Sequence, residues 1–261
     1  MTNLFRTSKC LLLGVLALAG GAQYSDYAIA QGSSSSSQQS VSSGDWRQIP
    51  KPLLPESTDP QGRAILNQRG QYFDTSAEPG LLEPTPPGIA RGGSVSVGLR
   101  DEIPFLDDGA IVVGSFNDYQ PFLSPVQKKI YTKLELSIEQ VIDSGPAHVS
   151  QGEKVDLLLS GGTIRLSDGR VISHGLRYEA TKYSLQPGHR YVLFLQYHAD
   201  GDFFTEVKSW DITTGVAMPN APDDQQRMKK GQSAFAGLPE SRFVDAVRLM
   251  ANQHRQQGAA H

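Results

Sequence analysis

The chain has 261 residues, a formal charge of −3 at pH 7 and a single cysteine, Cys10. The charge stays negative, at −4, when the first thirty residues are removed, because they contain two basic residues and one acidic residue. This slightly acidic balance predicts neither nucleic acid nor an anionic membrane surface as a partner.

Residues 1–30 have the pattern of a secretory signal peptide. A basic start with Arg6 and Lys9 runs into the apolar stretch 10–19, and residues 28–30 form the small-residue sequence Ala-Ile-Ala. The apolar stretch is well short of the roughly 20 residues that a membrane-spanning helix needs. We therefore expect a cleaved signal, a secreted or periplasmic protein, and no integral membrane segment after cleavage.

Cleavage is expected after Ala30, and Ala22 is the alternative position. Cys10 stands at the start of the apolar stretch, whereas the lipid-attached cysteine of a bacterial lipoprotein would stand at its end, so lipid attachment is not expected. Either cleavage removes Cys10. The mature chain then has no disulfide, no thiol catalysis and no cysteine-ligated metal.

Two segments precede the predicted domain. Residues 31–58 begin with a run of serines and glutamines that has little to bury, which predicts a flexible Ser/Pro-rich linker. Residues 59–102 are rich in proline and glycine, which favours an irregular arm. Apolar pairs such as Ile65-Leu66 are scattered through the arm. The arm either lies on the domain or becomes ordered only when it meets a partner.

Residues 103–218 have the alternation and the turn signals of a β domain. Residues 110–116 are an apolar run around Gly114, which predicts a buried strand with a bulge or a close backbone approach at the glycine. Residues 129–142 alternate between apolar and polar, which predicts a long half-buried strand. Its apolar face is expected to hold Ile130, Leu134, Leu136, Ile138 and Ile142.

Further strands are predicted at 154–160, 163–166, 170–173, 190–198 and 203–211. The pair Gly161-Gly162 predicts a bulge or sharp bend between the first two of these strands. Asp168-Gly169 predicts a two-residue type I′ hairpin turn, and Asp200-Gly201 predicts the turn of a second hairpin.

The chain is predicted to end in a loop and a helix. Residues 219–237 are polar and indicate a connecting loop. Residues 238–256 have amphipathic helical spacing with Pro239 in the first turn, which predicts a helix packed against one end of the β domain.

The fold class that these elements predict is mainly β. Short strands joined by hairpin-length turns favour an antiparallel barrel or sandwich, and a five-stranded Greek-key barrel of the OB-fold type fits best, with a C-terminal amphipathic helix.

The β domain also carries recognisable stretches at 161–165, 167–172 and 188–195. They resemble an uncharacterised group of exported bacterial proteins whose expected fold is similar to the barrels of netrin-like modules and metalloproteinase inhibitors. The resemblance spans roughly residues 103–249 and implies a fold without assigning a function. Those inhibitors are disulfide-bonded, so a mature chain without cysteine argues against protease inhibition.

Catalytic and metal-binding motifs are weak in this sequence. The Gly/Ser stretch 92–98 lacks the Gly-x-Ser-x-Gly spacing of a nucleophile elbow. His198, Asp200 and Asp202 could ligate a metal at one hairpin tip, although the pattern is more typical of an ordinary Asp-Gly turn. We therefore predict no cofactor and no catalytic residue.

Aromatic side chains are the remaining functional signal. On a barrel face they could form stacking platforms for a sugar or a peptide, and inside a barrel they would fill the core. The candidates are Tyr119, Phe122, Tyr131, Tyr178, Tyr183 and Trp210. Lysines at 128, 129 and 133 beside Tyr131 indicate a solvated strand edge, so no nucleic acid is expected.

The sequence therefore predicts an exported, non-catalytic binding module for an envelope protein, a peptide or a glycan. Two alternatives stay open. One is a hydrolase or metal-dependent enzyme whose residues converge only in the fold, and the other is a structural envelope component held by the Ser-rich segment.

Overall fold

The computed structural model of the chain describes residues 46–55, 59–74, 102–175 and 185–258. The predicted signal peptide and the candidates Tyr178 and Tyr183 lie outside these ranges. Within the described ranges, no helix is both long and apolar enough to cross a membrane.

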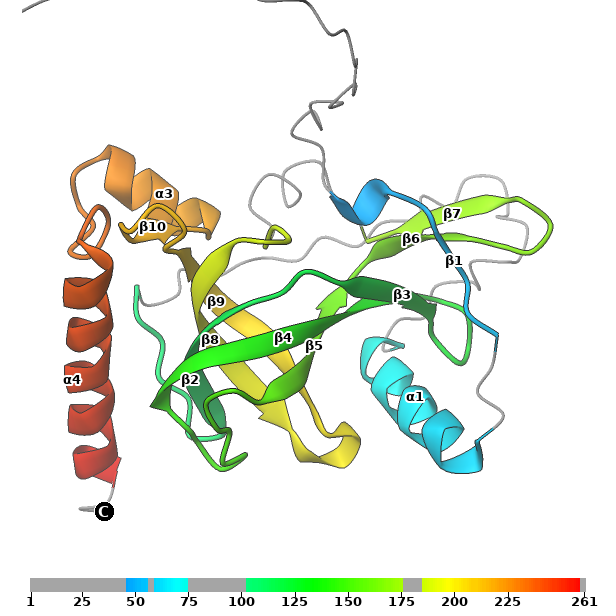
Figure 1. Ribbon diagram of the computed structural model, residues 1–261, viewed down its shortest axis with the longest axis horizontal. Coiled ribbons are helices and arrows are strands. Elements are labelled where there is room, and N and C mark those ends of the chain that lie inside the picture. The colour runs from blue at the N-terminus through cyan, green and yellow to red at the C-terminus, as the bar shows by residue number, and fades with distance from the viewer. Residues whose placement is uncertain (1–45, 56–58, 75–101, 176–184, 259–261) are drawn as a thin grey trace, which may run out of the picture. The chain divides into compact units, whose positions relative to one another are not determined.

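Five strands close into a barrel (Figure 1). They are β2 (Gly109–Ser115), β4 (Ile130–Asp143), β5 (Lys154–Ser160), β8 (Arg190–His198) and β9 (Phe203–Asp211). Around the barrel β2 pairs with β4, β4 with β5, β5 with β9, β9 with β8, and β8 again with β2. All pairs are antiparallel except β5 with β9. The predicted mainly β fold with an OB-fold-like barrel is confirmed.

The long strand β4 supplies much of the barrel interior. Leu134, Leu136 and Ile138 point into the core together with apolar residues of the other four strands. The register between β2 and β4 shifts twice, and such a bulge moves the following side chains to the other face. Val141 therefore packs against the interior, and Ile142 packs outside the barrel. The predicted face of Ile142 was wrong.

Gly114 stands where β2 approaches β4 most closely. A Cβ at this position would lie 2.7 Å from the carbonyl oxygen of Ser137, and one register shift falls between Val113 and Gly114. The predicted bulge and close backbone approach are both present.

A smaller sheet extends from the barrel. Its order is β1 (Lys51–Pro52), β6 (Gly162–Arg165) and β7 (Val171–His174), with β1 parallel to β6. Gly161 and Gly162 both have positive φ and carry the chain from β5 into β6, which confirms the predicted bend. A short strand, β3 (Tyr119–Leu123), pairs with the start of β4.

The turn between β6 and β7 differs from the prediction. The amide of Leu166 donates to the carbonyl of Arg170, and the amide of Gly169 donates to the carbonyl of Leu166. Of the three residues 167–169 in this loop, only Gly169 has a positive φ. A type I turn followed by a left-handed glycine gives this geometry, so the predicted two-residue type I′ turn was wrong.

Residues 46–55, which precede the barrel in the chain, form a short helical turn and a strand. A 3₁₀ turn, η1 (Trp46–Gln48), places Trp46 in the barrel core cluster, where the indole Nε1 donates to the carbonyl of Leu185 at 2.5 Å. β1 follows within the predicted linker 31–58. Residues 46–55 are therefore part of the fold, which corrects the linker prediction for this portion.

The predicted irregular arm, 59–102, begins with a helix, α1 (Pro60–Phe73). Asp59 caps it by accepting hydrogen bonds from the amides of Gln61 and Gly62, and Pro60 occupies the first turn, where a missing N–H costs nothing. The prediction of irregular structure is wrong for residues 60–73, while its placement of the arm on the domain holds for α1.

Two helices close the described chain. α3 (Pro222–Lys229) lies in the predicted polar loop 219–237 and follows the two-residue strand β10 (Met218–Pro219), so that prediction was wrong there. The buried Asp224 of α3 forms an ion pair with the buried Lys208 at 2.7 Å. α4 (Glu240–Gly258) is the predicted amphipathic helix.

α4 covers the outer wall of the barrel (Figure 1). The sequence predicted a helix packed against one end of the barrel, and this placement was wrong. Its buried face packs against outward-pointing side chains of β2, β8 and β9. The contact residues include Phe243, Val244, Val247 and Ala251 of the helix and Ile111, Val113, Val192, Phe194 and Trp210 of the strands.

Candidate functional site

Helix α1 lies across the outer face of β4 and β5 (Figure 1). Phe73 stacks on Tyr131 with ring centroids 5.3 Å apart, and the Tyr131 hydroxyl donates to the carbonyl of Leu66 at 3.3 Å. Tyr131 is only 1% exposed, and this burial raises the pKa of its phenol. In five-stranded barrels of this type, the face of the second and third strands commonly binds ligands. Here α1 covers the part of that face around Tyr131 and Leu158.

Arg69 fastens α1 to the barrel. Its guanidinium donates to the carbonyls of Gly201 and Asp202 at 2.8 and 2.7 Å, and to the carboxylate of Asp156 at 2.6 Å. Lys133 contacts the other oxygen of Asp156 at 3.0 Å. Because a planar guanidinium donates in a fixed fork, these bonds set the angle at which the helix crosses the strands.

A groove of about 250 Å³ runs beside α1, and we call it the arm groove. One wall is the extended segment after β1, the second is α1, and the third is the β3–β4 turn. The lining residues are Leu53, Leu54, Pro55, Arg63, Leu66, Asn67, Phe122, Leu123, Ser124, Pro125, Gln127 and Tyr131. Most of them are apolar, and Arg63 is the one charged residue among them.

The β3–β4 turn is held against α1 by Asp74. Its carboxylate accepts a hydrogen bond from the Ser124 hydroxyl at 2.5 Å and another from the Val126 amide at 3.3 Å. Gly70 allows close packing here, since a Cβ would lie 2.4 Å from the Cδ of Pro125. The groove wall is thus fixed to the helix.

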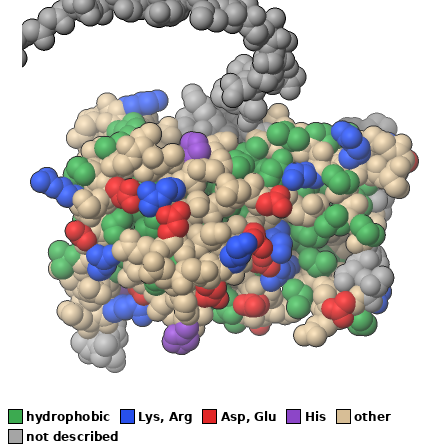
Figure 2. Space-filling view, viewed as in Figure 1, with side chains coloured by type: hydrophobic (Ala, Val, Ile, Leu, Met, Phe, Trp, Pro, Cys, Tyr) green, Lys and Arg blue, Asp and Glu red, His purple; other side chains and the backbone are tan. Residues whose placement is uncertain are grey.

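Apolar side chains reach the surface around the arm groove. Leu54 is 46% exposed and Val126 in the adjoining turn is 53% exposed. Ile65 and Tyr72 of α1 are exposed as well. Figure 2 shows hydrophobic side chains at the surface on the half of the molecule that holds α1 and the second sheet. Such clustering is typical of a surface that binds a partner.

The structure separates the aromatic candidates. Tyr131 and Trp210 are buried, at 1% and 0% exposure, so they do not form open stacking platforms. Phe122 stacks on Tyr131 and lines the arm groove. Tyr119 is partly buried, and its hydroxyl donates to the carbonyl of Trp46. Phe122 and Tyr131 both line the arm groove.

The predicted metal ligands do not come together. His198 shares a hydrogen bond with Thr205 at 2.8 Å, while the Asp202 carboxylate accepts one from Tyr197 at 3.1 Å. Asp200 is exposed. Partial burial lowers the pKa of His198 below its usual value of 6.5. The described residues contain no group of three or more His, Cys, Asp or Glu side chains that could hold a metal ion.

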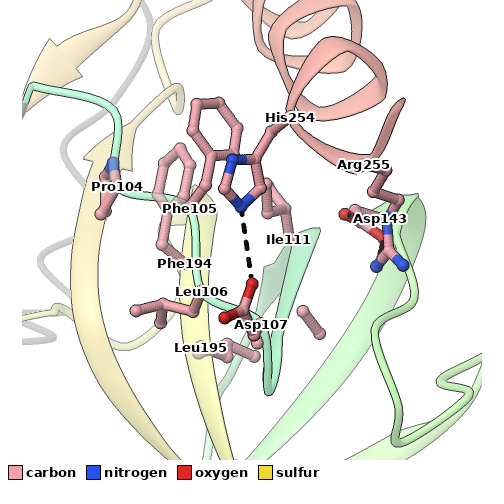
Figure 3. Close-up of a pocket in the computed structure, with 12 residues that line it drawn as sticks. Pro104, Phe105, Leu106, Asp107, Ile111, Asp143, Phe194, Leu195, His254 and Arg255 are labelled. Carbon is pink, nitrogen blue, oxygen red and sulfur yellow. Dashed lines mark hydrogen bonds and ion pairs between the residues drawn. The ribbon is translucent and has the colours of Figure 1, made fainter. Parts of the chain in front are cut away.

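A second cavity, of about 260 Å³, lies between the end of α4 and the barrel, and we call it the α4 pocket (Figure 3). Its apolar wall comes from the segment before β2, from β2 and from β8. His254 and Arg255 project from α4 at its rim, facing Asp107 and Asp143 respectively. The sequence predicted none of these four as a site residue, because the two members of each facing pair are more than a hundred residues apart.

No model of a known protein family matches the chain, and no curated protein matches it. The two cavities and the surface around them are therefore the basis for a functional argument.

Proposed function

We propose that the protein is an exported, non-catalytic binding module that holds a peptide segment of an envelope protein in the arm groove. The observation that carries this proposal is a partly exposed apolar groove with a single cationic side chain, located beside the barrel face that related architectures use for ligands. That correspondence of position is an analogy between folds, and the chemistry of the groove carries the argument.

The lining of the arm groove favours an apolar side chain over a sugar. Leu54, Leu66 and Phe122 offer aliphatic and aromatic carbon, whereas a buried sugar needs a hydrogen-bond partner for most of its hydroxyls. Of the polar lining residues, Ser124 and Tyr131 already donate their hydroxyls to Asp74 and to the Leu66 carbonyl, so Arg63, Asn67 and Gln127 remain for a ligand. A leucine-sized or aromatic side chain of a peptide would fill the groove and leave the peptide backbone at its polar rim.

Arg63 adds a preference for negative charge. Its side chain is exposed on α1 and makes no ion pair with any described residue. A guanidinium binds a carboxylate through two parallel hydrogen bonds, so an Asp or Glu next to the apolar side chain of the peptide would complete the site. The preferred ligand is an acidic peptide with one large apolar residue.

A peptide array probed with the exported protein tests this proposal, with peptidoglycan fragments as the competing ligand class. Bound peptides should carry a large apolar residue next to Asp or Glu, and Leu54→Asp and Arg63→Glu should each abolish their binding. Leu249→Asp is the matched control, because Leu249 is 60% exposed on α4 and lines neither cavity. Binding of glycan fragments alone, or equal loss in the control, would contradict the proposal.

Export is tested separately, by fractionating cells that express the full chain and weighing the purified protein. A secreted or periplasmic product whose N-terminus is Gln31, or Gln23 for the alternative cleavage, is expected. A full-length cytoplasmic product would contradict it.

A further inference from the structure

The α4 pocket presents aromatic rings around an open space (Figure 3). Phe105 and Phe194 line it, and the His254 ring stacks on Phe105 with centroids 5.2 Å apart and an interplanar angle of 23°. Aromatic faces carry negative electrostatic potential and attract organic cations. Ile111 and Leu195 supply further apolar wall.

Two carboxylates stand at the rim of the α4 pocket, and an arginine neutralises only one of them. Arg255 donates through Nε to Asp143 at 2.7 Å and makes a second bond through Nη2, so these two charges neutralise each other. The carboxylate of Asp107 is 98% exposed and faces His254, whose Nε2 lies 3.7 Å away, too far for a hydrogen bond. Asp107, Asp143 and Arg255 together give the lining a formal charge of −1.

We propose that the α4 pocket binds a compact organic ammonium ion. The alkyl groups of the ligand lie against the partly exposed side chains of Phe105 and Leu106, and its positive charge lies next to Asp107. Ile111 and Phe194 form the floor beneath them and are only 5% and 1% exposed. A cavity of roughly 150 Å³ accommodates benzene, so 260 Å³ has room for a methylated ammonium head with a short chain. A neutral ligand of the same shape would gain only the apolar contacts.

Choline and its uncharged isostere 3,3-dimethylbutan-1-ol are the probes that separate charge from shape. Titration of the full exported chain by NMR should show choline perturbing signals of Ile111, Leu195 and His254, with the isostere binding about tenfold more weakly or not at all. Asp107→Asn should weaken choline binding by about three- to fivefold, as expected for one exposed charge pair. Asp108→Asn is the control, because Asp108 is the exposed neighbour that does not line the pocket.

Three results would overturn the proposal. Equal binding of choline and the isostere would show that the pocket selects only for apolar shape. Equal weakening by Asp107→Asn and Asp108→Asn would reduce the effect to the general acidity of the surface. Absence of any shift at these residues at high millimolar choline would remove the site altogether. Asp107 is exposed, so its substitution leaves the fold intact and each outcome is interpretable.

Discussion

Replacing Trp46 with alanine should destabilise the whole barrel, although Trp46 lies in a segment whose sequence resembles a linker. The indole is 5% exposed, packs on Phe116 and Tyr119 at centroid distances of 5.6 and 4.3 Å, and bonds to the carbonyl of Leu185. Buried Phe or Trp to Ala changes cost about 3–5 kcal/mol, and a buried carbonyl left without a donor adds about 1–3 kcal/mol. Because water can partly replace the lost donor, we expect a loss of about 4–6 kcal/mol.

Urea unfolding followed by circular dichroism measures this loss. Trp46→Phe should recover more than half of it, because the phenyl ring keeps most of the aromatic packing and lacks only the N–H donor. Ile49→Ala is the matched control, since Ile49 lies three residues further along and is 53% exposed, and it should cost less than about 0.5 kcal/mol. If Trp46→Ala and Ile49→Ala had the same small effect, the segment would be a linker after all.

Three further predictions concern Arg69, which holds α1 on the barrel, the titration of His198, and the bulge at Gly114. Arg69→Ala should cost about 2–4 kcal/mol and speed amide hydrogen exchange in α1, because one carboxylate oxygen of Asp156 and two carbonyls lose their donor; unchanged exchange would contradict this. Stability should fall as the pH is lowered below 6.5, because the unfolded chain then binds a proton at His198 more readily than the fold does; His198→Gln should flatten this fall in a series of thermal melts. Gly114→Ala should cost about 1–3 kcal/mol by forcing a methyl group toward the carbonyl of Ser137, which chemical denaturation would detect.

The barrel strands could be predicted because their signals are local. Residues 154–160, 190–198 and 203–211 match β5, β8 and β9 residue for residue. In each case a short run rich in apolar side chains is bounded by glycine or a charged turn, so neighbouring residues alone define the strand. The Asp168-Gly169 turn shows the limit of such signals, since the dipeptide marked the position of the turn but predicted the wrong loop length.

The arm could not be predicted in the same way. Asp59 and Pro60 are a recognisable helix start, yet Gly62 and Gly70 lower the helix propensity of the residues that follow. What stabilises α1 is tertiary, above all the bonds from Arg69 to carbonyls 132 and 133 residues away. The glycines of α1 disfavour a helix, but these long-range hydrogen bonds stabilise it. A pattern of neighbouring residues does not reveal such bonds.

The candidate sites depended even more on distant contacts. Alternation placed Trp210 on a face of its strand, but the covering of that face by α4 turned a possible platform into core. Conversely, Asp107 and Asp143 are unremarkable acidic residues until the last turns of α4 bring His254 and Arg255 opposite them. Cavities of this kind arise from the packing of elements, and no residue in them carries a sequence signature of its own.

Residues 46–55 and helix α1 of the arm together connect the stability of the fold to binding in the arm groove. Trp46 packs in the barrel core, β1 extends the smaller sheet, and residues 53–55 and α1 form two of the three groove walls. Only molecules in which α1 is docked on the barrel would bind a peptide in the groove. By linkage, the free energy by which docking favours peptide binding equals the free energy by which the bound peptide favours docking. Arg69→Ala should therefore weaken peptide binding without touching the peptide, in proportion to the fraction of molecules whose α1 has detached.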